Sequence, residues 1–336
     1  MDSVATLDEQ ERRLLFNETA ARMGFAPWVA EKDFWVCWVL KALFTVPDSH
    51  PRLLFKGGTS LSKVFAVIER FSEDVDLSVN REDLGFVGNR DPEVLSGNAR
   101  HRMLRELDQA AVDFVRSELQ PRLHDRFAQV LGDDGSWRIQ GSQGGPNLVF
   151  EYPPATETLR VGYVSQTILI EIGARSDHGP AGDHAISPYA HEHFPEYFTD
   201  PTCTVTVMDA TFWEKATILH AVCHGGAEKV RARLSRHYYD LQRLSETSIG
   251  VAARGNAELL ERVRIHKSVY FPSGWARYDE AKPGSLRLVP GDDVVQALRR
   301  DFEEMARAGY FYGEDPPSFK QIIDGLGTLE ARINRS

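Results

Sequence analysis

The chain has 336 residues and a formal net charge of −10, because its 49 acidic side chains outnumber its 39 basic ones. A hydrophobic content of 42% excludes a long disordered chain, and the acidic balance argues against a protein that coats nucleic acid by bulk charge. The net charge does not exclude a local basic groove. With three cysteines, no CxxC pair, no signal peptide and no apolar stretch of membrane-spanning length, we expect a cytoplasmic protein that does not enter a membrane.

The first two thirds of the chain are predicted to mix helices and strands. Apolar residues at helical spacing predict helices at 7–23 and 28–44, and a short apolar run predicts a buried strand at 53–55. Thr59 or Ser60 can cap a further helix. The other elements expected before residue 209 are the rest of that helix as far as Ile68, a strand at 75–79, a helix at 99–130 that Pro121 can break, strands at 137–140, 147–152, 167–174 and 204–208, a loop at 81–97 and a loop-rich stretch at 176–201.

The last third of the chain is predicted to be helical. The expected helices lie near 211–224, 228–247, 256–270, 292–308 and 317–333. The fold class is therefore α/β (α+β). We expect a helical N-terminal segment at 1–50, a mixed core at 51–200, and a helical C-terminal domain at 201–336 that completes the active-site cleft.

A glycine turn after the strand at 53–55 suits phosphate binding. Gly57 and Gly58 let the backbone approach a bulky ligand closely and adopt positive φ. Thr59 and Ser60 supply hydroxyls at the N-terminus of a helix, whose free N–H groups attract anions. A Gly-Gly turn alone is common and is weak evidence for such a site.

An aspartate pair follows on the next predicted strand. Asp74 and Asp76 are two residues apart, which places both carboxylates on one face. They would repel each other unless a divalent cation lay between them, although a lone pair of this kind can also be a solvated edge. Together with the glycine turn, the pair is what phosphoryl or nucleotidyl transfer needs.

Lys215 interrupts the apolar stripe of a predicted helix. Phe212, Leu219 and Val222 lie on the same stripe, so the ammonium group must find an anion or extend to solvent. We favour binding of a nucleotide triphosphate over extension to solvent.

The motifs resemble a known family. KGGTSLSK followed by RFSEDVDL is similar to the core motif of the nucleotidyltransferase superfamily that includes DNA polymerase β, and more specifically to the AbiEii/AbiGii family of bacterial toxins. EKDFWV at 31–36, WEKA at 213–216 and SRHYYDL at 235–241 resemble further motifs of that family. The resemblance implies a polymerase-β-like core with a small mixed sheet. It also implies a type IV toxin that adds nucleotides to tRNA 3′ ends and is opposed by a cognate antitoxin.

The resemblance assigns roles in nucleotide and metal binding. It implies that Asp74 and Asp76 bind Mg²⁺ or Mn²⁺. A third carboxylate often comes from a neighbouring strand, and Glu171 is the only charge inside TILIEIGA; the alternative is an edge-strand residue that faces water. The residues expected to bind the NTP are Lys56, Gly57, Gly58, Thr59, Ser60 and Lys215.

The last motif assigns a role to Asp240. This residue could orient Lys215 or act in proton transfer, and a carboxylate on a helix surface is the alternative. Many family members read RDxYDL here, whereas this chain has His237 at the position of the first Asp.

Other charged and histidine residues have no predicted catalytic role. Glu31, Lys32 and Asp33 can pin the N-terminal helix to the core through ion pairs. His220 and His224 have zinc-pair spacing without further ligands, so a helix surface is the preferred interpretation. The basic residues expected to form a track for RNA or triphosphate are Arg52, Lys56, Lys63, Arg70, Lys229, Arg231, Arg233, Arg236 and His237. A solvated helix face is the alternative.

The predicted function is metal-dependent transfer of a nucleoside monophosphate from an NTP to an acceptor hydroxyl, with catalytic roles for Asp74, Asp76, Lys215 and Asp240. Two other classes stay open. The same residues could transfer a nucleotidyl or phosphoryl group to a protein hydroxyl, or the protein could be a nucleotide-binding regulator without turnover.

Overall fold

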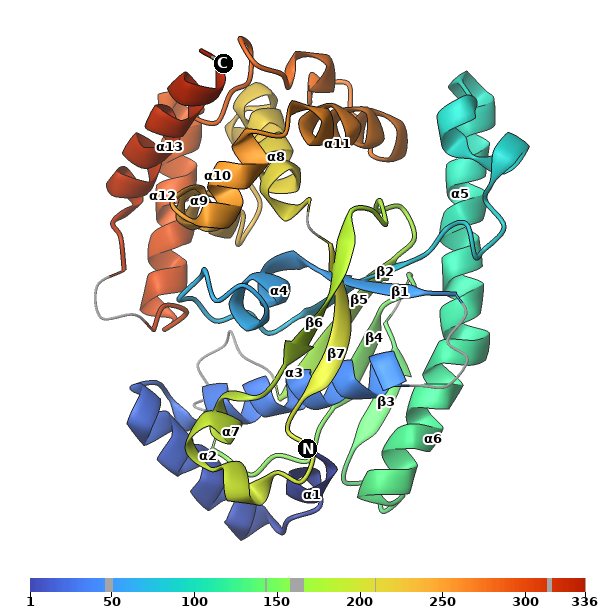
Figure 1. Ribbon diagram of the computed structural model, residues 1–336, viewed down its shortest axis with the longest axis vertical. Helices are drawn as coiled ribbons and strands as arrows, with labels where there is room; N and C mark the ends of the chain where they lie inside the picture. Colours follow the sequence, from blue (N-terminus) through green and yellow to red (C-terminus); the bar gives the residue numbers. More distant parts are fainter. Residues whose placement is uncertain (46–50, 143, 158–165, 209, 313–315, 336) are drawn as a thin grey trace. The chain divides into compact units, whose positions relative to one another are not determined.

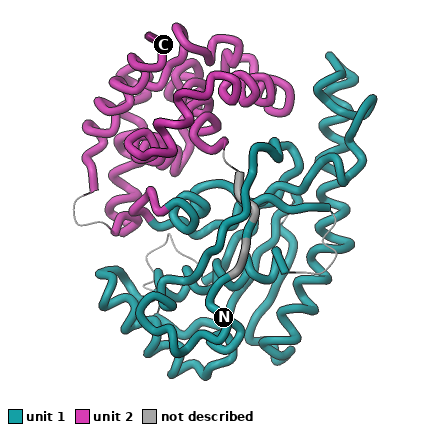
Figure 2. The backbone as a smooth tube through the Cα atoms, viewed as in Figure 1, with its two compact units in different colours: residues 1–65, 71–208 teal, residues 66–70, 209–336 magenta. Residues whose placement is uncertain are grey.

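The computed structural model describes residues 1–45, 51–142, 144–157, 166–208, 210–312 and 316–335. The chain divides into two compact units, coloured separately in Figure 2. Unit 1 comprises 1–65 and 71–208, and unit 2 comprises 66–70 and 209–336. The segment expected at 1–50 and most of the core expected at 51–200 therefore fall in the same unit, whereas 66–70 fall in the other.

Unit 1 contains, within the described residues, a seven-stranded mixed sheet with the order β3-β4-β5-β2-β1-β7-β6 (Figure 1). β1 pairs antiparallel with β2 and parallel with β7, β2 pairs parallel with β5, and the remaining neighbours are antiparallel. The strands are β1 Leu53–Lys56, β2 Val75–Val79, β3 Arg138–Gly141, β4 Leu148–Glu151, β5 Thr167–Gly173, β6 Ala181–Ile186 and β7 Cys203–Met208.

Helices of unit 1 pack against this sheet, with α3 against β5 and β7 and α4 against β1 and β2 (Figure 1). The helices are α1 Asp2–Ala5, α2 Glu9–Met23, α3 Pro27–Thr45, α4 Gly57–Lys63, α5 Gly97–Phe114, α6 Gln120–Leu131 and α7 Tyr189–His193. Five residues in π conformation, Val115–Leu119, join α5 to α6. They directly precede the turn that holds Pro121, which lacks the N–H that a regular helix would use.

Aromatic side chains from α3, α6 and β4 form the centre of the unit 1 core. The Trp35 and Trp38 rings meet edge to face with centroids 5.4 Å apart, and the ring centroids of Trp38 and Phe127 are 4.7 Å apart. Phe127 in turn lies 4.7 Å from Phe150. These rings are buried, and their burial fixes α3 against the sheet.

Unit 2 is a set of helices in which α9 contacts α8, α10, α12 and α13. The helices are α8 Thr211–Gly225, α9 Ser235–Ser245, α10 Ser248–Arg254, α11 Ala257–Tyr270, α12 Asp292–Arg307 and α13 Phe319–Ile333. The segment 66–70 is held here by backbone bonds, because Arg70 forms a β-bridge with Phe311 and the Glu69 carbonyl accepts from the Tyr312 N–H at 3.2 Å. No described helix of either unit combines the length and apolarity that crossing a membrane requires.

The structure confirms the mixed α/β class and the predicted strands, and it differs from the prediction in several other elements. The helix after β1 ends at Lys63 and does not reach Ile68, because Ala66 adopts a left-handed φ of 50°. β6 lies in the stretch at 176–201 that the sequence predicts to be rich in loops. Its polar sequence AGDHAI escapes detection because it forms an edge strand. The helix expected at 228–247 begins only at Ser235.

Candidate functional site

Three charged residues form one row across the centre of the unit 1 sheet. Lys56 at the end of β1 pairs directly with Asp76 on β2, and Asp76 pairs directly with Glu171 on β5. Paired residues on neighbouring strands point to the same face, so one cation and two carboxylates lie side by side. β5 is an interior strand, so the alternative of Glu171 on a sheet edge is wrong.

Gly57 follows this row, and its backbone lies directly against a carboxylate. Its φ is +80°, and a Cβ built on it would be 1.8 Å from Oδ2 of Asp76. A side chain at this position would occupy the space of the carboxylate. The first glycine of the turn is therefore required both by the left-handed backbone and by the close approach of Asp76.

The two hydroxyl groups of the glycine turn are used inside unit 1. Oγ1 of Thr59 donates to the carbonyl of Asp74 at 2.5 Å, and Oγ of Ser60 donates to the carbonyl of Gly57 at 2.8 Å. Both side chains are buried. Helix α4 begins at Gly57 with Lys56 as its N-cap, so the expectation that Thr59 or Ser60 caps it is wrong. The first turn of α4 offers a ligand backbone N–H groups rather than hydroxyls.

The charged triplet at the start of α3 ties three parts of unit 1 together, which confirms its predicted structural role. Glu31 accepts backbone N–H bonds from the segment after β4, at 2.6 and 3.0 Å. Lys32 forms a buried ion pair with Glu73, 2.5 Å long, and Asp33 forms another with Lys63 of α4. Burial raises the pKa of Glu31 and of Asp33, so their hydrogen bonds and ion pairs offset a real cost of desolvation. We refer to these contacts as the α3 clamp.

Asp74 and the two carboxylates of the sheet row form a donor set that fits a hard divalent cation. Asp74 directly precedes β2, so extended-chain alternation puts its side chain on the same face as Asp76 and Glu171. Carboxylate oxygens are the donors that Mg²⁺ and Mn²⁺ prefer. Across the described residues, however, no three His, Cys, Asp or Glu side chains are gathered closely enough to form a metal site. The three carboxylates share a face without forming a closed site.

In unit 2, Lys215 and Asp240 belong to a buried ion network that also contains Arg70. Nζ of Lys215 is 2.8 Å from Oδ2 of Asp240, and the guanidinium of Arg70 binds both oxygens of Asp240 at 2.7 Å. All three side chains are at most 6% exposed. The alternative of Asp240 as a carboxylate on a helix surface is therefore wrong.

The charges of this network decide what Asp240 can do chemically. Burial alone would raise the pKa of Asp240, but Arg70 and Lys215 outweigh burial and hold that pKa far below its usual value. Burial lowers the pKa of Lys215. A carboxylate fixed by two cations is a poor proton acceptor, so the geometry suits a group that positions Lys215.

Several basic residues of the predicted track have partners within the protein. Arg52 pairs with Asp83, and Arg233 donates to the hydroxyl of Tyr310. Like Lys63 and Arg70, both arginines bind partners within their own unit. This weakens the predicted basic track.

His220 is fully buried, which corrects the interpretation of a helix surface. Its Nε2 is 3.0 Å from the carbonyl of Arg277, and its Nδ1 is 3.1 Å from the N–H of Arg287. Both ring nitrogens are thereby committed to the backbone, and burial lowers the pKa of the imidazole.

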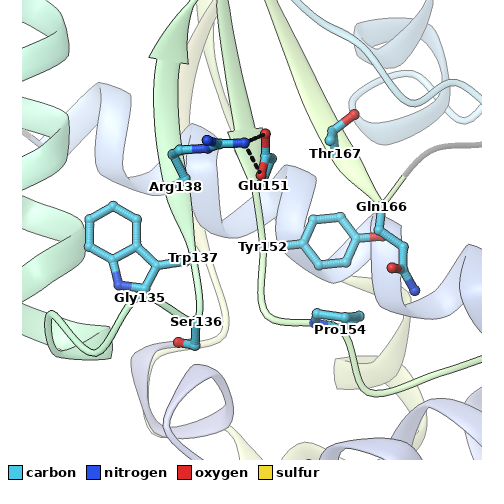
Figure 3. A pocket seen from close by; sticks show the side chains of 9 residues that line it. All are labelled: Gly135, Ser136, Trp137, Arg138, Glu151, Tyr152, Pro154, Gln166 and Thr167. Carbon is cyan, nitrogen blue, oxygen red and sulfur yellow. Dashed lines mark hydrogen bonds and ion pairs between the residues drawn. The ribbon is translucent and has the colours of Figure 1, made fainter.

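A separate cavity of about 540 Å³ opens beside the outer strands of the unit 1 sheet (Figure 3). It shares no residue with the sheet row. The charges on its rim compensate each other, because Nη2 of Arg138 binds both carboxylate oxygens of Glu151 at 2.7 and 2.9 Å. Its lining residues are Gly135, Ser136, Trp137, Arg138, Glu151, Tyr152, Pro154, Gln166 and Thr167.

The predicted site residues thus divide between the two units. Unit 1 holds Lys56, Asp74, Asp76 and Glu171 with the glycine turn, and unit 2 holds Lys215 and Asp240. Sequence reasoning missed Arg70 as the partner of Asp240. The available signal was an arginine inside RFSEDVDL, directly before an aromatic residue, but nothing local links positions 170 residues apart.

A comparison with protein-family models assigns the chain to a family. A family model described as "Nucleotidyl transferase AbiEii toxin, Type IV TA system" matches residues 38–325. That range includes every residue of the sheet row, the glycine turn and the Lys215 network. No curated protein matches the sequence. Among solved structures, the chain is similar to the nucleotidyltransferase toxin MenT4 of Mycobacterium tuberculosis, with 18% identity and a TM-score of 0.43, over 94% of this chain and 98% of that one.

Proposed function

Because the chain belongs to the AbiEii nucleotidyl transferase toxin family of type IV toxin–antitoxin systems, we propose that it transfers a nucleoside monophosphate from an NTP to an acceptor hydroxyl. The acceptor we propose is the 3′ end of tRNA in the cytoplasm, and we expect a cognate antitoxin to oppose the reaction. The single observation that carries the proposal is the Lys56–Asp76–Glu171 row lying against Gly57.

Asp74 and the two carboxylates of the row are the proposed metal ligands. Asp74, Asp76 and Glu171 would hold Mg²⁺ or Mn²⁺, with Gly57 leaving room for the Asp76 carboxylate. A bound divalent cation would supply charge stabilisation for the attacking and leaving oxygens. Thr59 supports this arrangement, because its hydroxyl donates a hydrogen bond to the carbonyl of Asp74.

The glycine turn and Lys56 are the proposed contacts to the NTP phosphates in unit 1. Because the hydroxyls of Thr59 and Ser60 are committed internally, we assign phosphate binding to the N–H groups of Gly57 and Gly58 and of the residues that follow. Lys56 is the positive charge within the row, and it offsets part of the repulsion between carboxylates and phosphates.

Lys215 is the proposed triphosphate ligand in unit 2, and Asp240 is proposed to act through it. The ion pair with Asp240 fixes the ammonium group of Lys215, and Arg70 fixes Asp240 in turn. In the reaction, the acceptor oxygen bonds to the α-phosphorus, the bond from that phosphorus to the bridging oxygen breaks, and pyrophosphate leaves. The acceptor proton passes to solvent.

The acceptor can be tested with matched RNA substrates. Purified tRNA is incubated with the protein, Mg²⁺ and each common NTP labelled at the α-phosphate. The same tRNA after periodate oxidation, which destroys the 3′ cis-diol, serves as the control. We expect label in intact tRNA alone. Label in oxidised tRNA would contradict the 3′ acceptor, and label in protein with none in RNA would favour a protein hydroxyl.

A further inference from the structure

His237 is held in one tautomer by its neighbour in unit 2. Its Nδ1 is 3.4 Å from Nζ of Lys215. An ammonium group has only donors, so Nδ1 must accept this hydrogen bond. In a neutral imidazole the proton then resides on Nε2, which becomes a hydrogen-bond donor.

The surroundings of His237 keep its imidazole neutral. Burial lowers the pKa of His237 well below its usual value, and the positive charges of Lys215 and Arg236 lower it further. The charge of Asp240 acts in the opposite direction but is shared with Arg70 and Lys215. A neutral ring with Nδ1 occupied can donate from Nε2 but cannot serve as a base there.

The Nε2–H group itself is available to a ligand. His237 is half-buried, and within the described part of the chain no protein group pairs with Nε2. Lys215 is locked by Asp240, which Arg70 binds with two hydrogen bonds, so the ring is oriented by a rigid series of contacts. A fixed donor beside a fixed ammonium group is a pattern suited to an oxyanion.

We propose that His237 contacts the substrate by donating its Nε2–H to an oxygen of the triphosphate that Lys215 binds. The inference rests on the proposed function, because it takes the triphosphate as the ligand of Lys215. A carboxylate at this position, the residue of the RDxYDL pattern, would compete for Lys215 and repel the ligand. His237 removes that negative charge and adds a donor.

Substitutions that keep or remove the Nε2 donor test the proposal. The His237→Gln variant places an amide N–H where Nε2 stood, His237→Asn reproduces only the Nδ1 position, and His237→Ala removes both. The probe is inorganic tripolyphosphate, measured as a competitor of NTP binding, together with KM and kcat for transfer. Thermal unfolding of each variant verifies that unit 2 remains folded.

We expect His237→Ala and His237→Asn to weaken tripolyphosphate and NTP binding by roughly 10- to 100-fold, the range for a hydrogen bond to a charged group. His237→Gln should restore most of the affinity, and His237→Asp should bind more weakly than His237→Ala. An unchanged inhibition constant for tripolyphosphate in His237→Ala, or equal losses in the Gln and Ala variants, would overturn the inference.

The wild-type protein and Lys215→Ala separate this inference from the proposed function. If the wild type binds NTP, and Lys215→Ala weakens binding whereas His237→Ala does not, only the inference about His237 fails. If the wild type binds neither NTP nor tripolyphosphate and transfers no label, both fail together.

Discussion

Gly57 is the residue at which backbone conformation and site chemistry depend on each other most closely. Its left-handed φ excludes most side chains, and the carboxylate of Asp76 fills the space that a Cβ would need. A methyl group would therefore have to displace Asp76 or the turn itself. The position thus links the start of α4 to the geometry of the carboxylate row.

We expect Gly57→Ala to lower transfer activity by about 100-fold or more, because a displacement of about 1 Å in a reacting group can cost that much. The measurement is kcat for transfer from an α-labelled NTP. Gly144→Ala is the matched control, since Gly144 has a φ of +84° but a Cβ there would meet nothing within 4 Å. Equal losses in both variants would attribute the effect to backbone strain and contradict the role of the contact.

His178 gives unit 1 a pH dependence with a definite sign. Its Nε2 is 3.0 Å from Oγ of Ser78 on β2, and burial lowers its pKa to about 4. The unfolded chain therefore binds a proton near pH 6.5, before the folded chain does, and stability falls as the pH drops from about 6.5 to about 4.

We expect His178→Gln to lose less stability than the wild type between pH 7 and pH 5, because it has no imidazole to protonate. The urea midpoint at both pH values measures this difference, since all other titrating groups are common to the two proteins. A wild type whose midpoint falls no more than that of the variant would be evidence against the depressed pKa.

At the scale of elements, the α3 clamp fixes the segments that carry Asp74 and the glycine turn. Lys32 reaches Glu73, the residue before Asp74, and Asp33 reaches Lys63 at the end of α4. A helix at the start of the chain thereby holds both the segment entering β2 and the helix that follows Gly57.

We expect Lys32→Ala to destabilise the protein by about 3–5 kcal/mol, because it removes the ammonium group that forms a buried ion pair with Glu73. Arg138→Ala is the control, since its pair with Glu151 is 61% and 37% exposed, and it should cost at most about 1 kcal/mol. Denaturant unfolding measures both. Similar losses in the two variants would contradict the clamp.

The double variant Lys32→Met, Glu73→Leu separates stability from positioning. Replacing a buried ion pair by apolar residues is often neutral for stability. If the pair positions Asp74, this variant should fold, but its kcat should be lower than that of the wild type. A stable variant with wild-type kcat would reduce the clamp to a purely structural role.

Elements with a strong local pattern could be predicted from the sequence, and elements defined by distant partners could not. Val75, Leu77 and Val79 alternate with polar residues, so β2 was evident. β6 is polar and exists because β7 pairs with it along its whole length. The early end of α4 depends on Ala66, whose left-handed φ carries no local signal.

At the scale of the whole molecule, the motif that suggests the chemistry is interrupted by a segment of the other unit. Residues 66–70 lie in sequence between the glycine turn and the Asp pair, yet they are bonded within unit 2. The sequence supplied the residue types of the site, including Asp240. It could not supply the network of Arg70 with Asp240, or the position of Glu171 beside Asp76, because both depend on pairing between distant segments.

The most direct test of the central claim compares label at the two ends of the triphosphate. The full-length protein is incubated with Mg²⁺, RNA and protein acceptors, and NTP labelled at either the α- or the γ-phosphate, with Asp76→Ala as a control whose folding is verified by thermal unfolding. We predict that α-label enters RNA, that γ-label enters neither acceptor, and that Asp76→Ala transfers nothing. Transfer of γ-label to protein, with no α-label transferred to either acceptor, would contradict nucleotidyl transfer.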